Sequence, residues 1–301
     1  MTETAVTDTA ITGTAITAPA AAPDAVIADI AAALKARRVV PYLGPGAFAL
    51  LPEGACPIPR NSAELTRSLN AKVAAPGRIR SQLTAVAQFI ETRRHRKTLD
   101  AILDGLFRQP VPATPVHAWL AALPAPPMIV DVWYDNVLEG LLAGRPGASW
   151  GQIQGLSHPQ GAGEWVKHYA PDGTEVAADA ARGWDTVLYK PSGSVTPAGN
   201  YLISDSDFVE ILTEIDIQTP IPPAVQERRA GRHFLYLGCR FDQEIQRTFG
   251  RQIAKRSADR HWAVIEGPLS RNEARFLEQQ NITRLDLPLA EAVERIAAAM
   301  A

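Results

Sequence analysis

The segment that decides the fold is MIVDVWYDNVLE, residues 128–139. Residues 128–130 are an apolar run typical of a buried strand. After a polar turn, apolar residues recur at helical spacing over residues 137–142, which predicts an amphipathic helix starting at Asp135. A strand leading directly into a helix is the junction where α/β proteins place ligand-binding groups.

Similar strands and helices are predicted on both sides of this segment. The first helix is expected to begin at Asp24, as its N-cap. Ser204 and Asp207 form a capping box that opens another helix. Strands are expected at 38–43, 186–190, 201–203, 233–237, 262–265 and 284–287. Further helices are expected at 62–69, 83–90, 99–107, 114–123, 241–253 and 289–300, and one more, which contains Phe276, after the strand at 262–265.

The alternation of strands and helices, with strands apolar on both faces, predicts an α/β fold. We expect a mostly parallel sheet covered by helices on both sides. Residues 62–123 contain consecutive helices without a strand, which indicates a helical insertion. Residues 143–183 are glycine-rich and weakly patterned, with a hairpin expected at 171–173. Residues 1–23 are rich in Thr and Ala and are expected to be a disordered tail, leaving 24–301 as one domain.

Composition narrows the class of protein. The chain has 301 residues, 46% hydrophobic and 21% charged, with a net charge of −2. This balance gives no argument for nucleic acid or membrane, and we expect neither as a partner. Cys56 and Cys239 are too few for a four-cysteine zinc site and read as reduced thiols in a cytoplasmic protein. We therefore expect no metal.

Two common catalytic motifs are absent from the sequence. It contains no P-loop and no HExxH zinc helix. The basic run at 93–97 is either a phosphate contact or a solvated helix end, and the second interpretation is favoured.

The order of the motifs resembles a known family. The chain contains VVPYLGPGA (39–47), GACPIPRNSAELTRSL (54–69), TPVHAWLAALPAPPMIVDVWYDNVLE (114–139), LYKPSGSV (188–195), YLISDSDFVEIL (201–212) and FLYLGCRFDQEIQRTF (234–249). Together they resemble the bacterial sirtuin-like domain of NAD-consuming anti-phage systems, over roughly residues 24–290. This resemblance implies a doubly wound, mostly parallel, Rossmann-like sheet that binds NAD. It also implies assembly into homo-oligomers.

The resemblance implies nucleotide contacts at the glycines. Gly44, Gly46 and Ala47 match the family's GAG loop, in which side-chain-free backbone lets amides approach a pyrophosphate. Pro45 replaces the middle alanine and removes one donor. Gly238 matches the glycine of the family's GYS motif. Simple turns are the alternative interpretation for both segments.

Two catalytic positions of the family carry other residues here. The family's TTNYD asparagine, which orients water and the ribose hydroxyls, aligns with Trp133. The histidine of its HG turn, the general base, aligns with Ser192, followed by Gly193. An indole cannot accept a hydrogen bond as a carboxamide does, and serine is no base near neutral pH. The loss of a positioned base alone typically costs about 100- to 10,000-fold in rate.

Other residues are candidates to substitute for the missing groups. Asp135 keeps the aspartate position of TTNYD, and Asp131 is a new carboxylate that either acts as a base in a rebuilt site or caps the turn. His117 matches a family histidine, for which a structural role is favoured. The sequence does not fix the positions of His158 and His168.

Three functions follow from these residues. The first is a nucleotide sensor, or a regulatory or interaction protein with a protein partner, that has lost efficient hydrolysis. It would bind NAD or ADP-ribose through residues 44, 46, 47, 133, 135, 192, 193 and 238. The second is an active NAD hydrolase with a site rebuilt around Asp131 and Asp135. The third is a structural assembly protein whose pocket is plugged by Trp133.

Overall fold

The computed structural model describes residues 22–147, 149–160, 164–217 and 221–301. The predicted tail therefore lies almost entirely outside the described residues. Helix α1 (Pro23–Lys35) begins one residue before the expected N-cap, because Pro23 fits the first helical turn. Asp24 lies in that turn without capping it and pairs with Arg295 at 2.5 Å.

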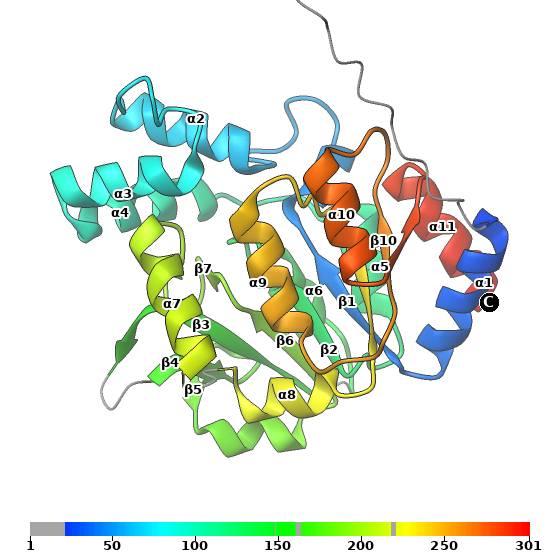
Figure 1. Cartoon of the computed structure of the whole chain (residues 1–301). Coiled ribbons are helices and arrows are strands. Elements are labelled where there is room, and N and C mark those ends of the chain that lie inside the picture. Colours follow the sequence, from blue (N-terminus) through cyan, green and yellow to red (C-terminus); the bar gives the residue numbers. More distant parts are fainter. Residues whose placement is uncertain (1–21, 148, 161–163, 218–220) are drawn as a thin grey trace, which may run out of the picture.

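A mixed nine-stranded sheet forms the centre of the described structure (Figure 1). Its order is β11-β10-β9-β1-β2-β6-β3-β4-β5, and only the pairs β3–β4 and β4–β5 are antiparallel. The predicted mostly parallel α/β sheet is confirmed. The strands are β1 (Val39–Leu43), β2 (Met128–Asp131), β3 (Trp150–Gln160), β4 (Glu164–Tyr169), β5 (Glu175–Val176), β6 (Thr186–Lys190), β9 (His233–Leu237), β10 (His261–Val264) and β11 (Ile282–Leu285), with a separate pair β7 (Gly193–Ser194) and β8 (Asn200–Tyr201).

Helices cover both faces of the sheet because successive strand residues point to opposite sides. In β1, Val40 and Tyr42 join one apolar cluster, while Val39 and Leu43 join the other. The first face carries α7 (Asp205–Ile217), α8 (Pro223–Arg229), α9 (Glu244–Ala254) and α10 (Arg271–Gln279). The second carries α1, α5 (Pro115–Ala122), α6 (Val137–Ala143) and α11 (Leu289–Met300).

A helical insertion stands beside the sheet, at the upper left of Figure 1. It follows the short 3-10 helix η1 (Pro45–Leu50) and consists of α2 (Ser62–Lys72), α3 (Leu83–Arg94) and α4 (Arg96–Phe107). It has its own apolar cluster, which also includes Trp133 and Tyr134. The insertion is shorter than expected, because α5 packs on the sheet through Val116 and Leu120.

The segment after α6 is more regular than its sequence indicated. Strand β3 is rich in glutamine, which weakens the strand signal. Its buried Gln152 and Gln154 are satisfied by the carbonyls of Thr196 and Ser194. The predicted hairpin is confirmed, because the turn at 171–173 joins the antiparallel strands β4 and β5. A second short 3-10 helix, η2 (Ala178–Gly183), precedes β6.

Most remaining predictions are confirmed, with shifts at element ends. Strand β11 starts two residues before the expected 284–287, and α8 was not predicted. The capping box of α7 is present, since the amide of Asp207 donates to Ser204 Oγ and the amide of Ser204 to the Asp207 carboxylate. Within the described ranges, no helix is long and apolar enough to cross a membrane.

Candidate functional site

The candidate site is a pocket of about 410 Å³ at the carboxyl ends of β1 and β9. The chain builds β1, β2 and β6 outward on one side, then returns to place β9 on the other side of β1. This reversal is the switch point where open α/β sheets bind ligands. It lies between β1 and β9, and the β2–α6 loop forms one wall. The lining comes from Tyr42, 44–46, 61–63, 83–84, 132–134, Ser192, Ile203, Phe208, 238–243, 245–246 and Phe249.

The glycine loops at the base of the pocket pack on each other. The amide of Gly44 donates to Leu237 O and that of Gly46 to Gly238 O, both at 2.9 Å. An added Cβ on Gly46 would lie 2.7 Å from Gly238 O. In the described conformation these two amides are therefore engaged within the protein, and their contact with a pyrophosphate stays a prediction. Both amides are used between the loops, and Ala47 does not line the pocket.

Trp133 is held at the pocket wall by two elements. Its side chain is 5% exposed, and its indole N–H donates to Pro59 O at 3.0 Å, in the loop before α2. Its ring meets Phe107 edge-on, with centroids 5.7 Å apart. The indole thus links the β2–α6 loop to the helical insertion, and Trp133 borders the pocket.

Ser192 also borders the pocket and is 6% exposed. Its carbonyl accepts from the amide of Leu202, which fixes the turn after β6. Gly193 does not line the pocket. It has a φ of +87°, and an added Cβ would lie 2.0 Å from Asn200 O, so the β7–β8 pair requires glycine there.

Asp131 lies behind the pocket wall and is tied to Lys190. Its Oδ2 accepts from Lys190 Nζ at 2.7 Å, and its Oδ1 accepts from the amide of Trp133. Lys190 Nζ also donates to Asp135 O at 2.8 Å. Burial raises the pKa of Asp131 to about 6, against the opposing effect of Lys190. The carboxylate positions the turn that presents Trp133 and is not among the pocket residues.

Asp135 and His117 each have one unpaired buried atom. Asp135 Oδ1 accepts from the amide of Val137, whereas Oδ2 has no hydrogen-bond partner among the described residues. His117 Nδ1 meets Thr114 Oγ1 at 2.7 Å and completes the capping box of α5, while Nε2 has no partner there. Burial lowers the pKa of His117. Neither residue lines the pocket.

Glu139 completes a buried group of charges around Lys190. Its two oxygens accept from Ser194 Oγ at 3.1 Å and Thr196 Oγ1 at 2.6 Å. Burial raises its pKa to about 7, although Lys190 nearby lowers it. Burial opposes the charged form of Lys190 too, but Asp131, Asp135 and Glu139 outweigh it and raise its pKa.

The raised pKa of Glu139 predicts that the stability of the protein depends on pH. The variant Glu139→Gln should reduce this dependence. The folded state holds a proton on Glu139 up to about pH 7, whereas the unfolded chain releases it near pH 4.5. The free energy of unfolding should therefore fall as pH rises from 4.5 to 7, by on the order of 2 kcal/mol from this group. Urea unfolding across this range should show a smaller fall in the variant. Equal slopes would contradict the assignment.

The remaining histidines lie away from the pocket. His158 Nδ1 contacts Glu210 Oε2 at 2.9 Å on the surface, and His168 is buried on β4 near the sheet edge. In the basic run at 93–97, Arg96 is half-buried and pairs with Asp207 at 2.8 Å, which ties α4 to α7. The other residues of the run are exposed, as the favoured interpretation expects.

Sequence reasoning missed part of the lining. Asn61, Ser62 and Thr84 come from the helical insertion, while Arg240 and Asp242 come from the β9–α9 loop. Asn61 and Ser62 belong to the motif at 54–69, so the sequence contained a signal that this segment contributes to the site. Thr84 carried none, because only the tertiary placement of α3 within the helical insertion brings it to the pocket.

The thiols of both cysteines contact backbone carbonyl groups. Cys239 lines the pocket, but burial raises its pKa and its Sγ contacts the carbonyls of Tyr42 and Leu237. Cys56 donates to Ile58 O. In the described part of the chain, no cluster of three or more His, Cys, Asp or Glu side chains could hold a metal ion.

The fold and the pocket together define a Rossmann-like protein with a crevice at its switch point. A family model for the SIR2-like domain matches residues 127–285, more than half of the chain, and the chain belongs to this family. The match begins just before β2 and ends with β11, so β1 and its glycine loop precede it. No curated protein matches the chain.

Proposed function

We propose that this chain binds NAD or an ADP-ribose-like nucleotide in the switch-point pocket and has lost efficient hydrolysis. It would act as a nucleotide sensor or regulatory protein. The observation that carries the proposal is the composition of the pocket. Trp133 and Ser192, which replace the family's asparagine and histidine, both border it. Of the described lining residues none is a histidine, and Asp242 is the sole carboxylate.

The polar groups that remain suit a phosphate. Helix α9 starts at Glu244 without a side-chain cap from Gln243, and Gln243, Ile245 and Gln246 line the pocket. The first amides of a helix have no partners within it, and its dipole favours anions at that end. Arg240 lies at the same wall, where two hydrogen bonds of 2.8 Å to Glu273 hold its guanidinium in place. These groups would take over the phosphate contact from the glycine loop.

A rebuilt hydrolase is less well supported. Asp131 is held by Lys190 and the amide of Trp133, and one oxygen of Asp135 caps α6. A general base must reach the proton it removes, directly or through one water. Since neither carboxylate lines the pocket, both serve better as positioning groups for its wall.

Blocking the pocket tests the binding proposal. Ala63 is an exposed lining residue on α2, so Ala63→Trp should fill the entrance without burying new volume in the core. Ala71, equally exposed on the same helix but away from the lining, provides the control Ala71→Trp. A ligand at about 100 times its Kd should stabilise the wild type by about 2.7 kcal/mol. We expect ADP-ribose and NAD to raise Tm in the wild type and in Ala71→Trp, but not in Ala63→Trp.

Two measurements on the wild-type protein, the thermal shift with nucleotide and the release of nicotinamide, distinguish the three functions. No shift with either nucleotide at millimolar concentration would favour a structural assembly protein. Nicotinamide release from NAD, followed over hours, should remain at the background rate if hydrolysis is lost. Release by the wild type that disappears in Asp131→Asn, with folding intact, would favour the rebuilt hydrolase.

A further inference from the structure

Three neighbouring strands each follow a turn rich in basic residues. The turns are KARR (35–38) before β1, ERRAGR (227–232) before β9 and KRSADR (255–260) before β10. Each holds three Lys or Arg, so together they contain nine of the chain's 30 basic residues. They contain only two of its 32 acidic residues, Glu227 and Asp259. The net charge of −2 averages over this asymmetry.

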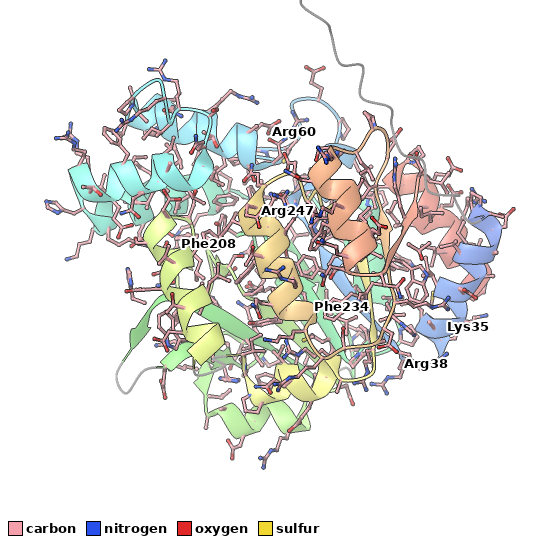
Figure 2. The ribbon with its side chains drawn as sticks, viewed as in Figure 1. Lys35, Arg38, Arg60, Phe208, Phe234 and Arg247 are labelled. Carbon is pink, nitrogen blue, oxygen red and sulfur yellow. The ribbon has the colours of Figure 1, made fainter. Side chains whose placement is uncertain are left out.

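The sheet brings the three turns to one edge. Strands β10, β9 and β1 are adjacent and parallel, so the turns that precede them meet at their amino ends. The amide of His233 donates to Arg38 O and that of Ala258 to Arg232 O, both at 2.9 Å. We call this surface the basic edge. It lies at the opposite ends of the strands from the pocket, and Figure 2 shows Lys35 and Arg38 there, at the lower right.

The basic edge combines anchored and free cations. Arg228, Arg229 and Arg232 donate to backbone carbonyls, and Arg260 pairs with Asp29 at 3.2 Å. Five others are exposed, and no hydrogen bond or ion pair joins their side chains to the described residues. These are Lys35, Arg37, Arg38, Lys255 and Arg256.

The backbone of two free arginines supports a role beyond packing. Arg37 follows α1 with a φ of 55°, and Arg256 follows α9 with a φ of 63°. The corresponding residue after α8 is Gly231, at 65°. Glycine is usual at this left-handed position after a helix, and a residue with a side chain is disfavoured there. Basic residues near a helix C-terminus also complement its dipole, but that needs neither the left-handed position nor so many charges.

We propose that the basic edge binds the phosphate backbone of nucleic acid without reading its bases. Arginine suits this partner because its planar guanidinium meets phosphate oxygens through two hydrogen bonds. Free cations on the turns before β1 and β10, on either side of the turn before β9, can contact several phosphates at once. A membrane is disfavoured because surface insertion needs exposed apolar side chains. Val209, on α7, is the one large hydrophobic exposed among the described residues, and α7 is not part of the basic edge.

Titration with a labelled mixed-sequence DNA duplex of about 30 base pairs tests this proposal. Because such contacts are non-specific, Kd should be about 10⁻⁴–10⁻⁶ M near physiological salt and tighter below it. The plot of log K against log salt should have a slope of about −3 to −4, since each neutralised phosphate contributes about −0.9. The variant Arg37→Glu/Arg38→Glu/Arg256→Glu should weaken binding at least tenfold and flatten the slope.

A second triple variant controls for total charge. Arg93→Glu/Arg94→Glu/Lys97→Glu makes the same charge change on exposed residues of the helical insertion. It should retain most of the affinity, and circular dichroism should show both variants folded. Equal losses in the two variants would overturn the assignment to the basic edge. So would absence of duplex binding at 50 mM salt, or binding to vesicles rich in phosphatidylserine with none to the duplex.

Discussion

Lys190→Met should destabilise the protein by about 3–5 kcal/mol at pH 7, because it leaves Asp131 buried without its partner. The two side chains are 1% and 2% exposed and 2.7 Å apart. The methionine replaces the volume of the lysine stem, so the loss reports the unpaired carboxylate more than a cavity. Urea unfolding measures it. The double variant Lys190→Met/Asp131→Asn should recover a large part, since the amide is neutral and its oxygen can still accept from the amide of Trp133.

A matched lysine separates burial from pairing. Lys167 also has a carboxylate partner at 2.8 Å, but that partner, Glu175, is 53% exposed. Lys167→Met should therefore cost no more than about 1 kcal/mol. The deficit of Lys190→Met should shrink at pH 5, where Asp131, with its pKa near 6, is already protonated in large part. A deficit of the same size at both pH values would contradict an electrostatic cause.

Gly238→Ala should cost about 2–5 kcal/mol and close the base of the pocket, for two reasons that add. The residue has a φ of +62°, which disfavours any side chain by about 1–2 kcal/mol. An added Cβ would also lie 2.5 Å from the amide nitrogen of Ala47 and 3.1 Å from Gly44 O. Relieving such overlap by backbone shifts typically costs about 1–3 kcal/mol more. Denaturant unfolding gives the total, and nucleotide titration of the folded fraction tests the pocket.

Two other glycines divide this cost into its parts. Gly231 has a φ of +65°, but an added Cβ meets nothing within 4 Å, so Gly231→Ala should show the backbone cost alone. Gly105, inside α4, has equally open surroundings and no left-handed backbone. Gly105→Ala should stabilise the protein by about 0.5–1 kcal/mol. If Gly238→Ala cost no more than Gly231→Ala, the close approach of the two loops would not matter.

The sequence determined the class of fold because its evidence is local. Apolar residues at period two or 3.6 mark strands and helices wherever they occur, and α/β order follows from their alternation. Segment 128–139 thus predicted both β2 and the helix after it. The prediction failed where local evidence was weak. Buried glutamines hid β3, and α8 is only seven residues long.

The site needed tertiary information. The sequence predicted Trp133, Ser192 and four glycines as site residues. Of these six residues, Gly193 alone does not line the pocket. It did not show that the amides of Gly44 and Gly46 are used by the end of β9 and the loop after it, nor that the indole of Trp133 reaches Pro59, 74 positions away. Those partners depend on which strands become neighbours.

What the sequence by itself determined is therefore the set of elements, together with the expectation that Trp133 and Ser192 stand at two positions that are catalytic in the family it resembles. What only the tertiary structure decided is the use of the remaining charges. Asp131 pairs with Lys190, 59 positions away, because β6 lies beside β2. The basic edge forms because β1, β9 and β10 are adjacent. Periodicity is a property of neighbours along the chain, whereas desolvation and charge pairing depend on neighbours in space.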